Sequence, residues 1–386
     1  MHTAADPGIE DRVVLSTTSL VAIAATFLLI GMVVSAYGPL LPILAHRFDV
    51  SLPIAGGVLS AHFAGALAGV VGSMRAMERL PNRHVVVAAL GFVAVGCALV
   101  ALAAAWPVML AAVFFLGIGF GALDIGLNQI VAHSEGARRT ALLNMLNGAF
   151  GLGAVLGPIL VALFGEHHFA LLYAGGAVLA VGLMGEGLRI PGRLPVAPRS
   201  TARRPRGLVI VFVIAFAFYV GTEAGVGGWS TSHLRSLGLG AATAAALTSG
   251  FWLAMAAGRL LVGLLPSRIA EWAVVVTGSA LGVVALLAAV SGPAAPVAYL
   301  VTGLVIAPIF PTGVVWLARL LPGDSRATSW LFPGAMVGGA VIPAVIGFVI
   351  TRVGMGGAPV VLSAVALGTF LAFSGARLLA TRPSGR

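Results

Sequence analysis

Twelve apolar stretches run through this chain of 386 residues, and the short segments between them hold most of its Arg, Asp, Glu and His side chains. A helix crosses the hydrocarbon core of a bilayer with about 20 mostly apolar residues, so each stretch has the length of one crossing. Only 9% of the residues are charged, against about 25% in a soluble domain. The sequence therefore predicts an all-α integral membrane protein. The predicted spans are residues 17–43, 52–74, 84–105, 108–132, 140–164, 169–189, 207–232, 241–265, 272–291, 296–320, 328–351 and 357–379.

The arginine residues indicate how the chain is oriented in the membrane. All 22 basic residues are arginine, and the cytoplasmic loops of membrane proteins carry the excess of basic residues. If the N-terminus is cytoplasmic, nineteen arginines fall on that side and three, Arg47, Arg235 and Arg352, on the other. We therefore expect both termini in the cytoplasm. We expect no bound nucleic acid, because the basic residues form no single patch. We also expect the first span to be retained, since it is longer than the core of a signal peptide.

The longest polar segment, residues 190–206, is rich in Pro and Arg and lies at the middle of the chain. It divides the sequence into a predicted N-terminal six-helix bundle, residues 1–189, and a predicted C-terminal six-helix bundle, residues 207–386. Two halves with the same orientation are parallel repeats, and in such transporters the solute binds near the middle of the membrane, between the repeats. We expect the linker to follow the cytoplasmic membrane surface, where arginine contacts anionic lipids.

Five segments carry a resemblance that covers nearly the whole chain: Gly38-Pro-Leu-Leu-Pro42, Gly119-Phe-Gly-Ala-Leu-Asp-Ile-Gly-Leu-Asn128, Leu142-Leu-Asn-Met-Leu-Asn-Gly-Ala-Phe-Gly-Leu-Gly-Ala154, Gly221-Thr-Glu-Ala-Gly-Val-Gly-Gly-Trp229 and Ala307-Pro-Ile-Phe-Pro-Thr312. They resemble the major facilitator superfamily, and within it the fucose-permease-like branch of sugar:proton symporters. The resemblance implies two six-helix bundles around a solute cavity. The chain departs from the family pattern at Ala76, where an Asp is usual, and at Asn147, where the sugar branch commonly has His.

Two acidic residues, Asp124 and Glu223, lie within predicted spans. A charged side chain at the bilayer centre costs about 2.5–3.5 kcal/mol on insertion scales, so such residues are functional candidates. Because a low dielectric disfavours the carboxylate, an acid that is alternately buried and opened to water can take up and release a proton. We predict this proton-coupling role for both acids. The structural alternatives are a hydrogen bond from Asn144 or Asn147 to Asp124, and a polar contact of Glu223 between helices.

Amide and aromatic side chains within the spans are the predicted contacts of the solute. Amides offer donors and acceptors and therefore suit polyhydroxylated solutes, and Asn128 shares a helical face with Asp124 four residues earlier. The alternatives are helix–helix contacts for the amides and interfacial anchoring for the tryptophans. A lone His62 is either a proton relay or an interhelical contact. The predicted substrate-binding residues are Asn128, Asn144, Asn147, Tyr219, Trp229, Trp316 and Trp330.

Sequence motifs of enzymes and of ATP-driven pumps are absent. The chain has no lysine for a phosphate-binding loop, and it contains no His-Glu-x-x-His metal motif and no Gly-x-Ser-x-Gly nucleophile motif. We therefore expect neither an enzyme nor a bound cofactor or metal.

Together these features predict a secondary active transporter that moves a small polar solute, expected to be a sugar, by proton-coupled alternating access. The expected partners are the solute, protons and membrane lipids, and the expected state is a monomer. The Lys-free, Ala- and Gly-rich composition is typical of a high-GC bacterial genome and favours the cytoplasmic membrane. The alternative is proton-antiport efflux of an amphipathic compound, since Gly151, Gly153, Gly157 and Pro158 resemble an antiporter motif of the same superfamily.

Overall fold

The computed structural model describes residues 14–134, 139–193, 206–262, 269–322 and 324–381, and every regular element among them is a helix. Twelve spans are long and apolar enough to cross a membrane. Each of them overlaps one of the predicted stretches, so the predicted all-α membrane fold is confirmed. The helices are α1 (Thr17–Arg47), α2 (Leu52–Ala55), α3 (Gly57–Met77), α4 (Asn82–Leu102), α5 (Trp106–Ala132), α6 (Arg139–Gly187), α7 (Arg206–Ser236), α8 (Ala241–Val262), α9 (Glu271–Ala289), α10 (Ala295–Ile306), α11 (Ile309–Leu320), α12 (Ser325–Ser329), α13 (Leu331–Val353) and α14 (Gly357–Thr381).

Two features of the spans differ from simple straight helices. α6 contains the fifth and sixth spans, which separate at Gly165, where φ is +61°. An L-residue rarely adopts that backbone conformation, so glycine lets the chain turn back between the two spans. The tenth span is divided into α10 and α11 at Ala307 and Pro308. The helix stops there because proline has no N–H to continue the helical hydrogen bonds.

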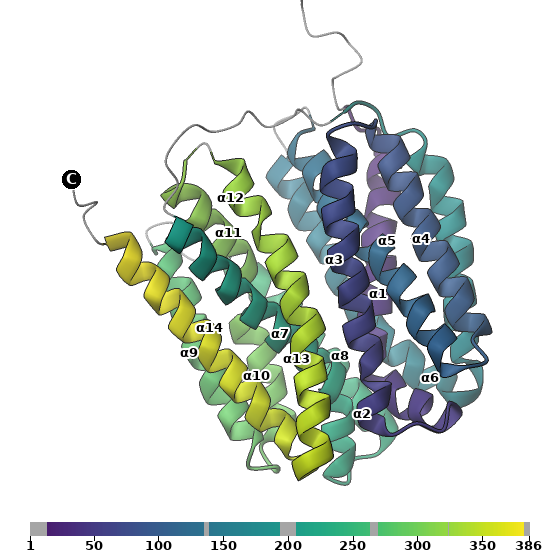
Figure 1. Cartoon of the computed structure of the whole chain (residues 1–386), viewed down its shortest axis with the longest axis vertical. Helices are drawn as coiled ribbons and strands as arrows, with labels where there is room; N and C mark the ends of the chain where they lie inside the picture. Colours follow the sequence, from purple (N-terminus) through teal and green to yellow (C-terminus); the bar gives the residue numbers. More distant parts are fainter. Residues whose placement is uncertain (1–13, 135–138, 194–205, 263–268, 323, 382–386) are drawn as a thin grey trace, which may run out of the picture.

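Figure 1 shows the helices in two groups that lie side by side, α1–α6 in purple to teal and α7–α14 in teal to yellow. Because successive spans alternate in direction, the start of α1, the end of α6, the start of α7 and the end of α14 lie on the same side, which we call the linker side. The chain that leaves α6 is attached there to α4. The side-chain amide of Asn82 donates to the carbonyl oxygen of Pro191 at 3.0 Å, and its backbone N–H donates to that of Gly192 at 3.1 Å.

The two groups of helices contact each other from the middle of the spans to the side away from the linker. α1 packs against α7 and α8, α3 against α13, and α6 against α8. In the closest of these contacts one partner is a glycine, which lets the helices approach closely. The pairs are Gly38 with Gly227, Gly228 with Leu59, Gly339 with Phe63, and Gly56 with Trp229. We call this set of contacts the glycine seal.

Candidate functional site

An ion pair at membrane depth joins α7 and α8. The Nη2 of Arg259 lies 3.9 Å from the Oε1 of Glu223, and the two side chains are only 23% and 15% exposed. Arg259 also directs Nη2 toward the Sδ of Met255, at 3.6 Å, while its Nε is buried without a hydrogen-bond partner. A buried charge pair that leaves donors unsatisfied is costly unless another group completes it. The pair is therefore the first candidate for a binding or coupling site.

Asp124 approaches this pair from the other group of helices. It lies on α5, is partly buried, and interacts electrostatically with both Arg259 and Glu223. The amide of Asn128 donates to the backbone oxygen of Asp124 at 2.8 Å and to its Oδ1 at 3.3 Å. The structure thus brings the two intramembrane acids together around one arginine, with Asn128 next to Asp124.

Two buried donors lie on the helices that carry the ion pair. Tyr219, one turn before Glu223 on α7, is 1% exposed and interacts electrostatically with Glu223 and Arg259. Trp252, two turns before Arg259 on α8, is 5% exposed, and its ring packs against Gly227. The Trp252 Nε1 has no hydrogen-bond partner, whereas the Tyr219 hydroxyl lies close enough to Glu223 and Arg259 to interact with both. Buried polar groups are rarely left unpaired, so the Trp252 indole in particular is suited to a polar solute.

Two residues of this site, Arg259 and Trp252, were missed by the sequence analysis. The arginine count assigned Arg259 to a cytoplasmic segment, although it stands six residues inside the predicted span 241–265. A basic residue at that depth is the signal that could have found it, because such residues need a partner within the membrane. Trp252 carries no comparable signal, since tryptophan is an ordinary residue of an apolar helix.

Of the two amides predicted on the fifth span, the structure describes the side chain of Asn147. Asn147 is exposed, and its Nδ2 donates to the carbonyl oxygen of Leu143 on its own helix at 2.9 Å. It shares a helical face with Gly151 and Ala154, both buried. The structure therefore does not form the hydrogen bond from Asn147 to Asp124 that was one structural alternative for this acid. Asn144 lies on α6, but its side chain is outside the described part of the structure.

The predicted aromatic contacts are dispersed through the C-terminal group of helices. Trp229 is fully buried in the glycine seal, and its indole N–H donates to the carbonyl oxygen of Pro343 at 3.3 Å. Trp316 packs in an aromatic cluster with Phe212, at 4.9 Å between ring centroids, and Phe373. Trp330 is 56% exposed at the start of α13 on the linker side. Of the predicted aromatic residues, the structure places Tyr219 beside the ion pair.

His62 is part of a separate buried group in the N-terminal helices. Its Nδ1 lies 3.0 Å from the hydroxyl of Tyr37, and its ring contacts Phe120 at 4.9 Å between centroids. The other ring nitrogen, Nε2, is buried without a partner. The structure thus gives His62 the interhelical hydrogen bond that was one of its two expected roles.

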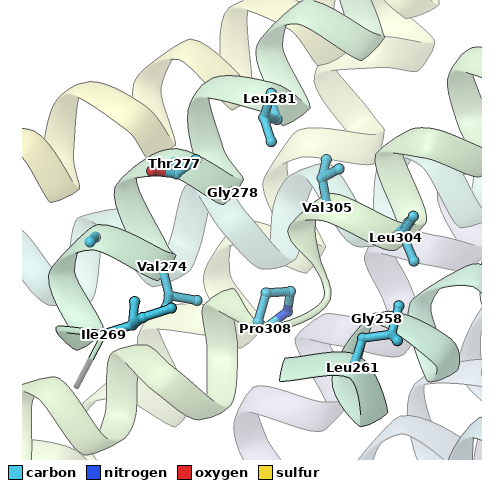
Figure 2. Close-up of a pocket in the computed structure, with 11 residues that line it drawn as sticks. Gly258, Leu261, Ile269, Val274, Thr277, Gly278, Leu281, Leu304, Val305 and Pro308 are labelled. Atoms are coloured by element: carbon cyan, nitrogen blue, oxygen red, sulfur yellow. The ribbon is translucent and has the colours of Figure 1, made fainter. Parts of the chain in front are cut away.

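A cavity elsewhere in the C-terminal group of helices is apolar. It has a volume of about 340 Å³ and is formed by α8, α9 and the break between α10 and α11. Figure 2 shows Gly258, Leu261, Val274, Leu304 and Pro308 around it, and among the described residues of the lining Thr277 has the one polar side chain. The described lining therefore offers few of the hydrogen-bonding groups that a polar solute requires. Among the described residues, no group of three or more His, Cys, Asp or Glu side chains could hold a metal ion.

Comparisons with known proteins agree with this architecture. The profile of the Major Facilitator Superfamily matches residues 23–221. The mouse sodium-dependent glucose transporter 1A is 25% identical over 371 residues, which cover 84% of this chain and 87% of that protein. The glucose/mannose transporter GlcP of Bacillus subtilis is 24% identical over 349 residues, which cover 84% of this chain and 86% of GlcP.

Solved structures share the fold. The fucose:proton symporter FucP of E. coli superposes with a TM-score of 0.62 and 17% identity, over 93% of this chain and 98% of FucP. At this level of identity the likeness establishes the arrangement of the helices.

Proposed function

This chain belongs to the Major Facilitator Superfamily, whose profile covers residues 23–221, and from that premise we propose that it is a sugar transporter that works by alternating access coupled to protons. It is a multi-pass membrane protein and a transporter rather than an enzyme, as are the relatives that it resembles over most of its length. The identities of the solute and of the coupling ion are our proposals.

The observation that carries the sugar assignment is the likeness to two glucose transporters over 84% of the chain. The site supports it. Every sugar hydroxyl can donate and accept a hydrogen bond, and the site offers acceptors on Glu223 and donors on Arg259, Tyr219 and Trp252. We propose that these four residues and Asn128 contact the sugar. Asn144, Asn147, Trp229, Trp316 and Trp330 remain weaker candidates because the structure places their described side chains elsewhere or leaves them undescribed.

We propose that the linker side is cytoplasmic, because nineteen of the 22 arginines then lie on the cytoplasmic side. The glycine seal in that case closes the outer side, and the conformation is inward-facing. The bundles are residues 1–189 and 207–386, joined by residues 190–206, of which 194–205 lie outside the described structure. We propose a monomer in the cytoplasmic membrane of a bacterium.

The proposed coupling ion is the proton, which Asp124 and Glu223 would carry. FucP is a fucose:proton symporter, whereas the mouse relative is sodium-dependent, so the assay has to separate the two ions. The efflux alternative has less support. Its motif residue Gly157 is explained by packing, since a Cβ there would lie 2.2 Å from the Oγ of Ser35 and 2.4 Å from the carbonyl oxygen of Met32.

The test is transport by the purified protein in liposomes that contain a pH-sensitive dye. Sugars from a panel of monosaccharides are added outside without sodium, then with sodium, and amphipathic amines are added in a separate series. We expect glucose or a related hexose to acidify the lumen without sodium, and Asp124→Asn to abolish this signal. The control is Glu186→Gln, which removes a linker-side pair with Arg189 (2.6 Å) and should leave the signal intact.

Three results would contradict parts of the proposal. Sugar uptake that is driven by sodium and moves no protons would mean that sodium, rather than the proton, is the coupling ion. If protons move only when amines are added, and in the opposite direction to the amine, the function is proton-antiport efflux rather than sugar symport. If the protein takes up none of the sugars and an equilibrium assay detects binding of none of them, the sugar assignment is wrong.

A further inference from the structure

An apolar groove on the C-terminal group of helices faces the surrounding membrane. It is the cavity of about 340 Å³ between α8, α9 and the break that separates α10 from α11 (Figure 2). Leu261 of α8, Leu281 of α9 and Leu304 of α10 line it and are 53%, 48% and 38% exposed. In a chain that spans a membrane, exposed apolar side chains at this depth contact lipid. The groove is therefore accessible to a lipid chain.

The groove follows α9 through one half of the membrane. Its lining begins at Ile269, just before the linker-side start of α9, and ends at Leu281. At a helical rise of 1.5 Å per residue these positions are about 18 Å apart, and one leaflet contributes about 15 Å to the hydrocarbon core. The groove thus has the length of one acyl chain that reaches from the head groups to the middle of the membrane.

Two arginines stand at the linker-side end of this groove. Arg319, near the end of α11, pairs with Glu271 of α9, and its side chain is 69% exposed. The guanidinium of Arg377 on α14 lies 3.2 Å from the centre of the Trp272 ring, the next residue of α9. Both of these α9 partners lie within three residues of Ile269 in the lining. The groove therefore ends in a cationic rim.

The cationic rim suits the phosphate of a lipid head group. A guanidinium carries five N–H donors in a fixed fork and binds phosphate through two of them. The pair with Glu271 uses Nη1 of Arg319, and a guanidinium over an aromatic ring still presents the donors at its edge. Two positive charges and one negative charge leave one positive charge among these three side chains. An anionic lipid is therefore favoured over a neutral one.

The head group, rather than the acyl chain, has to select the lipid. Lipid tails are as apolar as the groove, so a tail that enters it from the bilayer gains packing contacts but no hydrophobic free energy. One basic residue near the membrane surface strengthens the binding of an anionic lipid about fivefold. Selective binding therefore depends on the two arginines, and the groove decides where the lipid lies.

We propose that the groove and its cationic rim bind one anionic phospholipid of the linker-side leaflet, with an acyl chain along α9 and the phosphate on Arg319 and Arg377. The inference goes beyond the proposed transport function. Gly258 belongs to the lining, and Arg259 of the ion pair follows it directly. The bound lipid therefore packs against the helix that carries the candidate functional site.

The test counts bound lipids by native mass spectrometry of the purified, delipidated chain in detergent. Phosphatidylglycerol, which is anionic, and phosphatidylcholine, which is neutral overall, are titrated in separate series with the same acyl chains. We expect the first phosphatidylglycerol to bind at least about fivefold more tightly than phosphatidylcholine. Both lipids can fill the groove, but the cationic rim attracts the anionic one more strongly.

Variants of the cationic rim test the head-group contacts. Arg319→Gln and Arg377→Gln should each weaken the binding of phosphatidylglycerol about fivefold and change the binding of phosphatidylcholine less. The matched control is Arg189→Gln. Arg189 is also 69% exposed on the linker side and pairs with Glu186, but it belongs to the N-terminal group of helices. This control should keep the wild-type affinity for both lipids.

A second pair of variants tests the groove itself. Thr277→Trp places a large ring in the groove from an exposed position of α9, where it leaves the core of the bundle undisturbed. We expect its affinity for phosphatidylglycerol to fall to the level of phosphatidylcholine, because the acyl chain can no longer enter. Val284→Trp is the control, since Val284 is 64% exposed on α9 and lies outside the lining. It should bind phosphatidylglycerol as the wild type does.

Three results would overturn the inference. One is equal affinity of the wild type for the two lipids. Another is wild-type affinity for phosphatidylglycerol in Thr277→Trp or in the double variant of Arg319 and Arg377. The third is a dimer that Thr277→Trp dissociates, which would make the groove a contact between two copies of this chain. Because no sugar is present, the sugar assignment and this inference fail separately.

Discussion

Gly38 of α1 lies directly against the carbonyl oxygen of Gly227 of α7, so that a Cβ at residue 38 would be 2.3 Å from that oxygen. The two residues belong to different bundles, and their contact lies toward the side away from the linker. The atom in the way is backbone, which cannot rotate aside as a side chain would.

Gly38→Ala should therefore open the glycine seal. Overpacking of this kind typically costs about 1–3 kcal/mol, and the cost applies only when the seal is closed. Leu59 lies in the seal and is 2% exposed, so the maleimide labelling rate of Leu59→Cys in a Cys97→Ala background measures how often the seal opens. We expect Gly38→Ala to accelerate this labelling about 5- to 150-fold. Gly91→Ala on α4 is the matched control, because no atom lies within 4 Å of the added Cβ. Equal rates for the two variants would mean that the contact does not close the seal.

Asp124→Asn should abolish the accumulation of sugar against its gradient and leave the exchange of sugar across the membrane intact. A side chain that cannot ionise cannot link sugar movement to a proton gradient, but it leaves the binding residues in place. We expect sugar to reach only equal concentrations on the two sides, while exchange of labelled for unlabelled sugar continues. Both rates are measured on the same liposomes. Loss of exchange as well would indicate that Asp124 binds the sugar itself.

Trp252→Phe should weaken sugar binding and leave the fold intact. The change keeps an aromatic ring against Gly227 and removes the Nε1 donor, which has no partner in the protein. A hydrogen bond contributes about 0.5–1.5 kcal/mol, so we expect KM to rise about 2- to 10-fold with little change in kcat. Trp106→Phe, at the start of α5, where the ring packs against Phe48, is the control and should leave KM unchanged. An unaltered KM in Trp252→Phe would exclude the indole from the sugar site.

Gly165→Ala should destabilise the protein without a direct effect on the site. Gly165 has φ +61° and ψ −163° between the fifth and sixth spans, a conformation that costs other residues about 1–3 kcal/mol. We expect a lower Tm in detergent. Gly175→Ala, also on α6 and with no atom within 4 Å of the new Cβ, should leave Tm unchanged or raise it, since Ala is the better helix former. A Tm unchanged in Gly165→Ala would argue against this conformation.

The spans could be predicted from the sequence because each one is a local property of about 20 consecutive residues. The neighbourhood of Asp124 and Asn128 was predictable for the same reason, since four residues make one helical turn. The break of the tenth span lies at Pro308, where a proline could have indicated it. These features depend on the chain next to each residue and on no distant contact.

The partners across helices could not be predicted in this way. Asp124 interacts electrostatically with Arg259, which follows it by 135 positions in the chain, and no periodicity within one helix encodes that interaction. Trp316 resembled a cavity residue, but its ring is part of an aromatic core with Phe212 and Phe373. The side-chain amide of Asn147 donates to the carbonyl oxygen of Leu143 on its own helix. Such choices depend on how helices rotate about their axes when they pack.

The glycine seal has a consequence for how fast the protein can work. In each of its contacts at least one partner has no side chain, so closing it freezes fewer rotamers than a seal of interlocking side chains would. Ordering one long side chain costs up to about 2 kcal/mol of conformational entropy, a cost that glycine avoids. Closing this seal therefore loses less conformational entropy than closing a seal of interlocking side chains would, which lowers one part of the cost of each transport cycle.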